Sequence, residues 1–234
     1  EQTVLLKTKK QEAELAALES QINPHFLYNI LNSIMWTALK HGEDEIADMA
    51  YSLGKFFRLS LNHGNEFITI AEEKDLILYY LKLQKYRYNN RIEYKISCDD
   101  NILGLLIPKL IIQPLVENSV VHGTENTNTT VNICINIYTE LESVIIIVKD
   151  NGTGIQPEIL KLLPKNLNKK SKAGNRNRLA LKNISERLDI IYGNAATFDI
   201  KSQLGRGTKV TIKLPIAKMQ SKGELENAEN SYCR

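Results

Sequence analysis

The dominant spacing of apolar residues along the chain changes near Arg91. Before that residue, apolar positions recur with the period of an α-helix through His25–Leu39 and Asp44–Leu61. A third helical pattern follows Thr69 and Glu72, which have the spacing of a capping box. Short polar breaks separate these three patterns. The first part of the chain therefore predicts a helical hairpin with a third helix leading out of it.

After Arg91 the dominant pattern is the alternation typical of β-strands, interrupted by helical stretches. The predicted strands are Ile92–Ser97, Val131–Thr139, Val144–Lys149, Thr197–Lys201 and Lys209–Leu214, and the predicted helices are Pro108–His122, Pro157–Leu163 and Leu179–Tyr192. This mixture predicts an α+β protein, in which the helical hairpin precedes an α/β sandwich whose helices cover one face of a mixed sheet.

The two ends of the chain differ from this central part. A repeat with alternating spacings of four and three residues opens it, at Val4, Thr8, Gln11, Leu15, Leu18 and Ile22. The repeat is typical of a short coiled coil, although an ordinary amphipathic helix also explains it. The tail from Ala217 is polar and predicts a flexible end. We thus expect four parts, residues 1–22, 23–90, 91–216 and 217–234.

Composition excludes several classes of protein. Of the 234 residues, 43% are hydrophobic and 24% are charged, which argues against a disordered chain. The net charge of +3 comes without a basic stripe interleaved with aromatic residues, so we expect no direct binding of nucleic acid. Cys98, Cys134 and Cys233 are too far apart for a zinc site and fit a reducing compartment. The longest apolar runs are too short to cross a bilayer, and the start at Glu1 indicates a piece of a longer chain.

A histidine follows a proline at the start of the first helical pattern. Pro24 interrupts the local helical hydrogen bonding, and a neutral imidazole such as that of His25 is a nucleophile near pH 7. Asn29 lies one turn further along and is placed to orient the ring. His25 is therefore a candidate acceptor of a phosphoryl group, although a histidine that only packs on a helix face is the simpler alternative.

Polar residues also interrupt the apolar helix that precedes Gly123. Asn118 and His122 are four residues apart and share a helix face, and Glu117 lies beside them. An asparagine oxygen is a suitable ligand for Mg²⁺ next to phosphates, and a carboxylate can order water or accept a proton. The alternative is a capped helix end whose polar groups are satisfied locally.

Two glycine-containing turns flank the last predicted strands. Asp150 follows a buried strand and precedes Gly152 and Gly154, so a carboxylate stands beside backbone that can approach a ligand closely. Gly207-Thr208 begins the final strand, and the hydroxyl of this threonine can bond a base. Ordinary β-turns explain either motif taken alone.

Taken in order, these four motifs resemble those of the sensor histidine kinases of the YesM/LytS type, over residues 13–215. The resemblance implies that residues 1–22 are a coiled-coil signalling linker and that residues 23–90 hold the dimerisation and phosphotransfer helices. Residues 91–216 would then be an ATP-binding domain of the Bergerat (GHKL) fold.

The resemblance also implies a role for each matching residue. His25 matches the phosphorylated histidine, Asn118 the Mg²⁺ ligand and Glu117 its acidic, catalytic neighbour. Asp150 matches the residue that reads adenine. The remaining ATP-binding positions are His122, Gly152, Gly154, Gly207 and Thr208.

The implied activity is ATP-dependent autophosphorylation of His25, followed by transfer of the phosphoryl group to an aspartate of a response regulator. ATP and Mg²⁺ are the implied cofactors, and a homodimer through the hairpin and the coiled coil is the implied assembly. By the same resemblance, this chain would be the cytoplasmic part of a plasma-membrane receptor whose transmembrane part lies outside it.

One motif departs from the family. Where such kinases carry Gly-x-Gly-Leu, this chain has Arg178-Leu179-Ala180-Leu181, so the two lid glycines are replaced. A basic run with Gly174 precedes them, formed by Lys169, Lys170, Lys172 and Arg176. The departure leaves two alternatives open. One is a non-catalytic or phosphatase-biased kinase dimer that docks a response regulator, and the other is a GHKL-type ATPase in which Glu117 activates water.

Overall fold

The computed structural model describes residues 24–61, 66–124, 129–160 and 176–219. Its contacts divide the chain into two compact units, residues 1–63 and residues 64–234. Each unit is described by itself. The predicted coiled coil over residues 1–22 lies outside the described residues. The same holds for Lys169, Lys170, Lys172 and Gly174 and for the tail from residue 220. No described helix combines the length and apolar character needed to cross a membrane.

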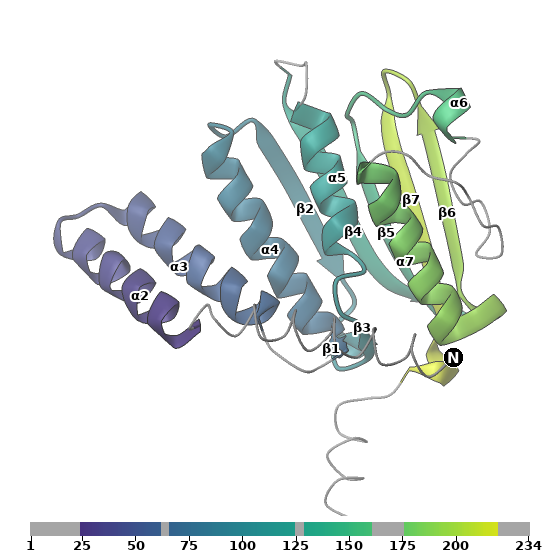
Figure 1. Ribbon diagram of the computed structural model, residues 1–234, viewed down its shortest axis with the longest axis horizontal. Helices are drawn as coiled ribbons and strands as arrows, with labels where there is room; N and C mark the ends of the chain where they lie inside the picture. The colour runs from purple at the N-terminus through teal and green to yellow at the C-terminus, as the bar shows by residue number, and fades with distance from the viewer. Residues whose placement is uncertain (1–23, 62–65, 125–128, 161–175, 220–234) are drawn as a thin grey trace, which may run out of the picture. The chain divides into compact units, whose positions relative to one another are not determined.

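The first unit is a hairpin of two helices, as the sequence predicts (Figure 1). Helix α2 spans Pro24–Lys40 and α3 spans Asp44–Ser60. Gly42 turns the chain between them with φ 74°, a conformation that costs glycine no steric energy. Small buried residues of α3, Ala47, Ala50 and Ser52, allow the two helices to pack closely.

The second unit contains a five-stranded sheet in the order β2-β4-β5-β7-β6 (Figure 1). Its strands are β2 (Ile92–Cys98), β4 (Val131–Glu140), β5 (Ser143–Asp150), β6 (Thr197–Gln203) and β7 (Gly207–Pro215). Strands β2 and β4 are parallel and the other neighbours are antiparallel, which confirms the predicted mixed sheet. Helices α4 (Ile70–Arg87), α5 (Gln113–Thr124) and α7 (Arg176–Tyr192) cover one face (Figure 1). This arrangement was predicted for the helices after Arg91, whereas α4 was assigned to the hairpin part of the chain. The short helix α6 (Pro157–Leu160) and three 3₁₀ turns, η1 (Asp100–Ile102), η2 (Gly193–Ala195) and η3 (Ile216–Lys218), complete the unit.

The prediction of a helix beginning at Pro108 is wrong. Pro108 ends a short strand, β3 (Leu106–Pro108), which pairs with β1 (Phe67–Thr69) in a separate antiparallel ribbon. Leu110 has φ 62°, which an α-helix does not tolerate, so α5 begins only at Gln113. Apolar runs of this length do not distinguish a buried strand from a helix, which explains the error.

Helix α4 belongs to the second unit by its packing. Thr69 and Glu72 form the predicted capping box, in which the Thr69 hydroxyl accepts from the Glu72 amide at 3.1 Å. Leu76, Ile77 and Leu81 of α4 are fully buried in the core of this unit. The functional division after residue 90 stays a prediction, whereas the contacts divide the chain after His63.

The packed structure also continues past the predicted end of the second unit at residue 216. Met219 is buried in the core, and the Lys218 amino group donates to the Tyr192 carbonyl at 2.9 Å. Residues 217–219 are therefore part of the fold rather than of a flexible tail.

The face of the sheet opposite the helices carries a row of lysines. Lys95, Cys134, Lys149, Lys209 and Lys201 are register partners on successive strands, and all five side chains are exposed. Neighbouring strands lie about 4.8 Å apart, so the row crosses the sheet in single file. The row contains no aromatic residue. It was not visible in the sequence because its members come from five separate strands.

We expect the substitution Ile146→Ala to lower the free energy of unfolding by about 2–5 kcal/mol, because it leaves a cavity in the core. Ile146 is 0% exposed in the centre of β5. Ile190→Ala is the matched control, since Ile190 is 84% exposed on α7, and we expect a change within about 0.5 kcal/mol. Urea unfolding of the two variants and the wild type measures both. Equal losses would contradict the described core.

Candidate functional site

A cavity of about 340 Å³ lies in the second unit, among α5, α7, the segment after β5 and the start of β7. It is lined by Leu115, Asn118, Ser119, His122, Asp150, Thr153, Gly154, Ile155, Gln156, Ile159, Leu181, Leu204, Thr208 and Val210. Predicted site residues from three of the sequence motifs therefore meet in one place. Its volume falls in the range of small-molecule pockets.

The Asp150 carboxylate is the most constrained polar group of this cavity. One oxygen, Oδ1, accepts from the amides of Gly152 at 2.9 Å and Thr208 at 3.1 Å. The other, Oδ2, accepts from the Ser119 hydroxyl at 3.0 Å. Asp150 is buried, so these hydrogen bonds compensate for the loss of water around the carboxylate. They also join α5, the turn after β5 and the start of β7 at one group.

Asn118 and His122 both line the cavity from α5, as their i, i+4 spacing predicts. The Asn118 amide nitrogen is enclosed and has no hydrogen-bond partner among the described residues. An enclosed polar atom of this kind needs a partner other than the described residues, such as a water molecule or a ligand. The His122 carbonyl accepts from the Thr153 hydroxyl at 3.2 Å, which attaches the turn after β5 to α5.

Two glycines of the motifs permit close backbone approaches beside Asp150. Gly154 has φ 70°, and a methyl group added there would overlap the Gln203 carbonyl. Gly207 has φ 97°, and a methyl group added there would overlap the Asp150 carbonyl. These residues must be glycine for the segment after β5 to approach the turn between β6 and β7 this closely. Gly152 also lies close to its neighbours, since a methyl group there would be 3.0 Å from the Gly123 Cα atom.

The Thr208 hydroxyl has a partner inside the protein. It lies 2.9 Å from the Ser202 hydroxyl. The Ser202 hydroxyl donates to the Gly207 carbonyl at 2.9 Å. Thr208 lines the cavity and contributes its backbone amide to Asp150. Its predicted contact with a base stays a prediction.

Glu117 lies next to Asn118 in the sequence but is not among the described residues that line the cavity. Its carboxylate accepts from the Gln113 side-chain amide at 2.7 Å. Burial, and secondarily the nearby charge of Glu117, raises the pKa of Tyr80 on α4. Helix α5 thus presents Asn118 and His122 to the cavity and Glu117 to other surroundings. The catalytic role of Glu117 stays a prediction.

His25 lies in the first unit, near the start of α2, and is exposed. Its Nδ1 atom is 3.3 Å from the Asn29 amide nitrogen, one turn further along the helix. The expected contact between these two side chains is therefore present, and it fixes one side of the imidazole ring.

The site contains residues that the sequence analysis missed. Ser119 was overlooked because it was not separated from the apolar helix around it, although it holds Asp150. Leu115, Leu181 and Val210 form an apolar wall and resemble ordinary core residues in the sequence. A serine on the buried face of a helix, next to Asn118, was the one available signal.

Helix α7 already includes positions 178 and 180, since it begins at Arg176. The residues that replace the two expected glycines are therefore helical, and Leu181 directly after them lines the cavity. Without glycine, nothing in the local sequence opposes this earlier helix start.

Comparisons with known proteins identify the family of the chain. Residues 13–92 match the family model described as "Histidine kinase", and residues 106–218 match "Histidine kinase-, DNA gyrase B-, and HSP90-like ATPase". The sensor histidine kinase YesM of Bacillus subtilis (strain 168) is 36% identical over 205 residues, which are 88% of this chain and 34% of that protein. The sensor protein LytS of Bacillus cereus is 34% identical over 207 residues, with the same coverage of each chain.

Among solved structures, a histidine kinase domain of the Erythrobacter litoralis EL346 blue-light activated histidine kinase aligns with a TM-score of 0.48 and 14% identity. The alignment covers 91% of this chain and 95% of that domain. The chain belongs to the sensor histidine kinase family. It spans about a third of the length of the curated relatives that it matches.

We expect Gly207→Ala to destabilise the protein by about 2 kcal/mol more than Gly205→Ala. Both positions have positive φ, 97° and 76°, so both variants carry similar backbone strain. Only at Gly207 does the added methyl group meet another atom, because the space around Gly205 is open to 4 Å. Urea unfolding gives both free energies. The same loss in both variants would contradict the close approach of Gly207 to Asp150.

Proposed function

We propose that this chain is the kinase part of a two-component sensor, which uses ATP to phosphorylate His25 and then passes the phosphoryl group to an aspartate of a response regulator. The observation that carries the proposal is the held carboxylate of Asp150 in a cavity that also contains the unpartnered amide of Asn118. The family of the chain supports it.

The cavity fits the base of a nucleotide. Among the described residues, three hydrogen bonds reach the Asp150 carboxylate, whereas a carboxylate offers about four acceptor sites. The remaining site suits an exocyclic amine such as that of adenine. Leu115, Leu181 and Val210 supply the apolar surface that a flat aromatic base requires. An adenine nucleotide therefore satisfies both the polar and the apolar parts of the wall.

Asn118 fits a role beside the phosphates. Its amide has an oxygen, which is a hard ligand for Mg²⁺, and the enclosed nitrogen lacks an acceptor. The described residues contain no cluster of three His, Cys, Asp or Glu side chains that could hold a metal alone. Mg²⁺ is usually bound by one or two protein groups together with phosphates and water. When bound, the ion neutralises phosphate charge.

The acceptor would be the Nε2 atom of His25. Attack on the γ-phosphorus requires the tautomer with its proton on Nδ1 and a lone pair on Nε2, and in that tautomer the Asn29 side chain would present its amide oxygen to Nδ1 in place of the nitrogen that lies 3.3 Å away. The bond from Nε2 to phosphorus forms while the bond to the bridging β,γ-oxygen breaks, and ADP leaves with the electron pair. The proton on Nδ1 passes to water. Asn29 thus orients the nucleophile, and the protein contributes mainly by positioning.

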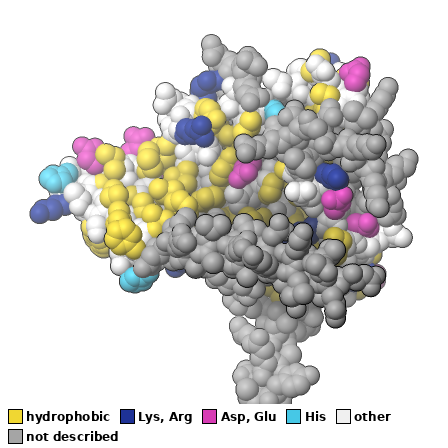
Figure 2. Space-filling model, viewed as in Figure 1, with side chains coloured by type: hydrophobic (Ala, Val, Ile, Leu, Met, Phe, Trp, Pro, Cys, Tyr) yellow, Lys and Arg dark blue, Asp and Glu magenta, His cyan; other side chains and the backbone are white. Residues whose placement is uncertain are grey.

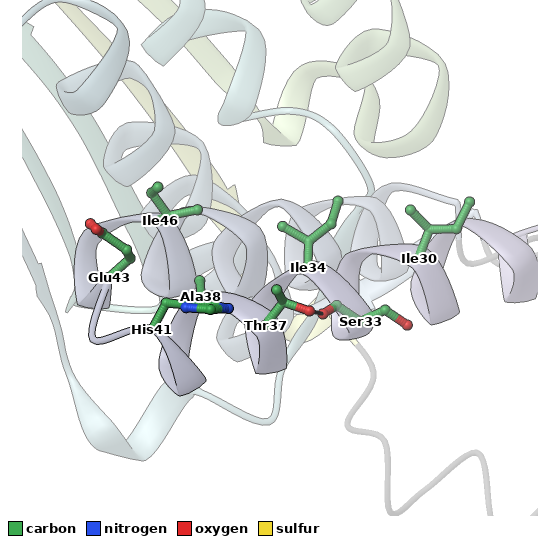
Figure 3. Close-up of a pocket in the computed structure, with 8 residues that line it drawn as sticks. All are labelled: Ile30, Ser33, Ile34, Thr37, Ala38, His41, Glu43 and Ile46. Carbon is green, nitrogen blue, oxygen red and sulfur yellow. Dashed lines mark hydrogen bonds between the residues drawn. The ribbon is translucent and has the colours of Figure 1, made fainter.

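The hairpin carries an apolar surface that suits a homodimer. The large exposed side chains of α2 and α3 are Phe26, Ile30, Ile34, Trp36, Leu39, Ile46, Met49 and Tyr51. Figure 2 shows hydrophobic side chains gathered over this hairpin. Ile30 and Ile34 of α2 and Ile46 of α3 border an open groove (Figure 3). Large exposed apolar patches on a protein surface mark interaction sites.

The resemblance to membrane sensors extends the proposal to the complete protein. In it, this chain would follow a transmembrane sensor and would act on the cytoplasmic side of the plasma membrane. A signal would then change the packing of the segment over residues 1–22 and so the frequency of phosphoryl transfer.

The first test is incubation with γ-labelled ATP and Mg²⁺. We expect acid-labile, base-stable label on the wild type, none on His25→Ala, and a strong reduction on Asn118→Ala. Lys40→Ala is the control, since Lys40 is exposed at the end of the same helix and is not among the residues that line the groove, and it should keep the label.

Other results would favour the alternatives. Absence of both label and nucleotide binding in the wild type would favour a non-catalytic dimer. Phosphate release that continues in His25→Ala would favour an ATPase.

For the dimer, we expect Ile34→Asp to weaken self-association by about tenfold or more, because the interface would bury an unpaired carboxylate. Leu141→Asp is the control, since Leu141 is 90% exposed in the turn between β4 and β5 of the other unit. Sedimentation velocity over a range of concentrations measures both. Unchanged self-association of Ile34→Asp would show that the groove is not part of the dimer interface.

A further inference from the structure

Glu73 is a fully buried carboxylate on α4 that accepts hydrogen bonds from the backbone immediately before α5 and at its first residue. Its Oε1 accepts from the amides of Ile112 at 3.0 Å and Gln113 at 3.3 Å, and its Oε2 accepts from the Leu110 amide at 3.1 Å. Gln113 is the first residue of α5. A side chain about 40 residues away in the sequence therefore caps the N-terminus of α5.

Each amide hydrogen in the first turn of α5 has an acceptor. Gln113 donates to Glu73, and Pro114 has no amide hydrogen. Leu115 and Val116 both donate to the Ile112 carbonyl, at 3.0 and 3.2 Å. The first turn of α5 also contains no acidic residue of its own. Glu73 thus supplies an acidic group at the positive end of the helix dipole, where such groups are favoured.

Two consecutive glutamates have different tasks. The Glu72 carboxylate accepts from the Thr69 amide at 2.8 Å and caps its own helix, α4. Glu73 is turned into the core and caps α5 instead. Burial raises the pKa of Glu73, and the three backbone amides together with Lys109 oppose that rise. The pair offers two chemically identical side chains whose effects can be separated.

The turn before α5 is held from a second direction by α7. The Arg187 guanidinium donates to the Lys109 carbonyl at 2.5 Å and to the Glu66 carbonyl at 3.1 Å. Leu110 follows Lys109, whose carbonyl bonds Arg187, and its own amide bonds Glu73. Its φ is 62°. A non-glycine residue keeps such a backbone only where its surroundings fix it.

The capped end of α5 is close to the ligand-facing residues of the cavity. Asn118 follows Gln113 by five residues, so it lies about 7.5 Å further along the helix axis. Ser119, which holds Asp150, is the next residue. A shift of the first turn of α5 therefore moves both groups relative to Asp150, and misplacement by about 1 Å is enough to impair a site of this kind.

We infer that Glu73 is a positioning residue of the nucleotide site, which acts from α4 by fixing the start of α5 and, through it, Asn118 and Ser119. The inference rests on the proposed function for the identity of the ligand. Glu73 itself is not among the described residues that line the cavity. Its effect is therefore indirect and separable from that of Asn118.

The test compares Glu73→Gln with Glu72→Gln in the complete chain. Each variant replaces one carboxylate oxygen with an NH₂ group and removes a capping charge. We expect Glu73→Gln to weaken binding of ATP in the presence of Mg²⁺ by about tenfold, the scale of loss for residues that support a metal ligand, and to have less effect when Mg²⁺ is left out. Glu72→Gln should stay within about twofold under both conditions, because its hydrogen bonds lie within the cap of α4.

Amide hydrogen exchange supplies a measurement that needs no nucleotide. Glu73→Gln should raise exchange at Leu110, Ile112 and Gln113, whereas Glu72→Gln should raise it at Thr69. Equal effects of the two variants on Mg²⁺-dependent affinity, or unchanged exchange at the start of α5, would overturn the inference. A wild type that binds no ATP would instead overturn the proposed function, and the inference with it.

Discussion

The carboxylate of Asp150 is the group on which the structure of the candidate site depends. Its three hydrogen bonds join a helix, the turn after a central strand and the start of the neighbouring strand. The glycines around it are required because their backbones pass so close to it and to one another. The acceptor capacity that the protein leaves on this carboxylate then faces a cavity with apolar walls. Recognition and local packing therefore depend on the same group.

The hairpin is organised on a different principle. Its two helices meet through small residues such as Ala47 and Ala50, which are buried, while large side chains such as Trp36 remain 66% exposed. The usual arrangement in a monomer places large apolar residues inside. An inverted distribution of this kind leaves most of the apolar surface available for a second chain. The hairpin thus combines an exposed histidine with a surface suited to association.

Much of this structure was predictable because its determinants are local. Alternating apolar residues identified all five strands of the main sheet, and Thr69 with Glu72 identified the start of α4. The motifs around Asn118 and Asp150 identified residues that do meet in one cavity. The short ribbon of β1 and β3 and the late start of α5 were missed. Both depend on a turn at Leu110 whose stabilising partners, Glu73 and Arg187, are far away in the sequence.

The cap on α5 also has a consequence for where the α/β unit can be cut. The change of hydrophobic period at Arg91 makes that residue an obvious place to begin an isolated fragment. Such a fragment would lack α4, and the amides of Leu110, Ile112 and Gln113 would lose their acceptor. It would also lack β1, the partner of β3. A fragment that keeps these contacts therefore begins before Phe67, and α4 belongs to the α/β unit as much as the sheet does.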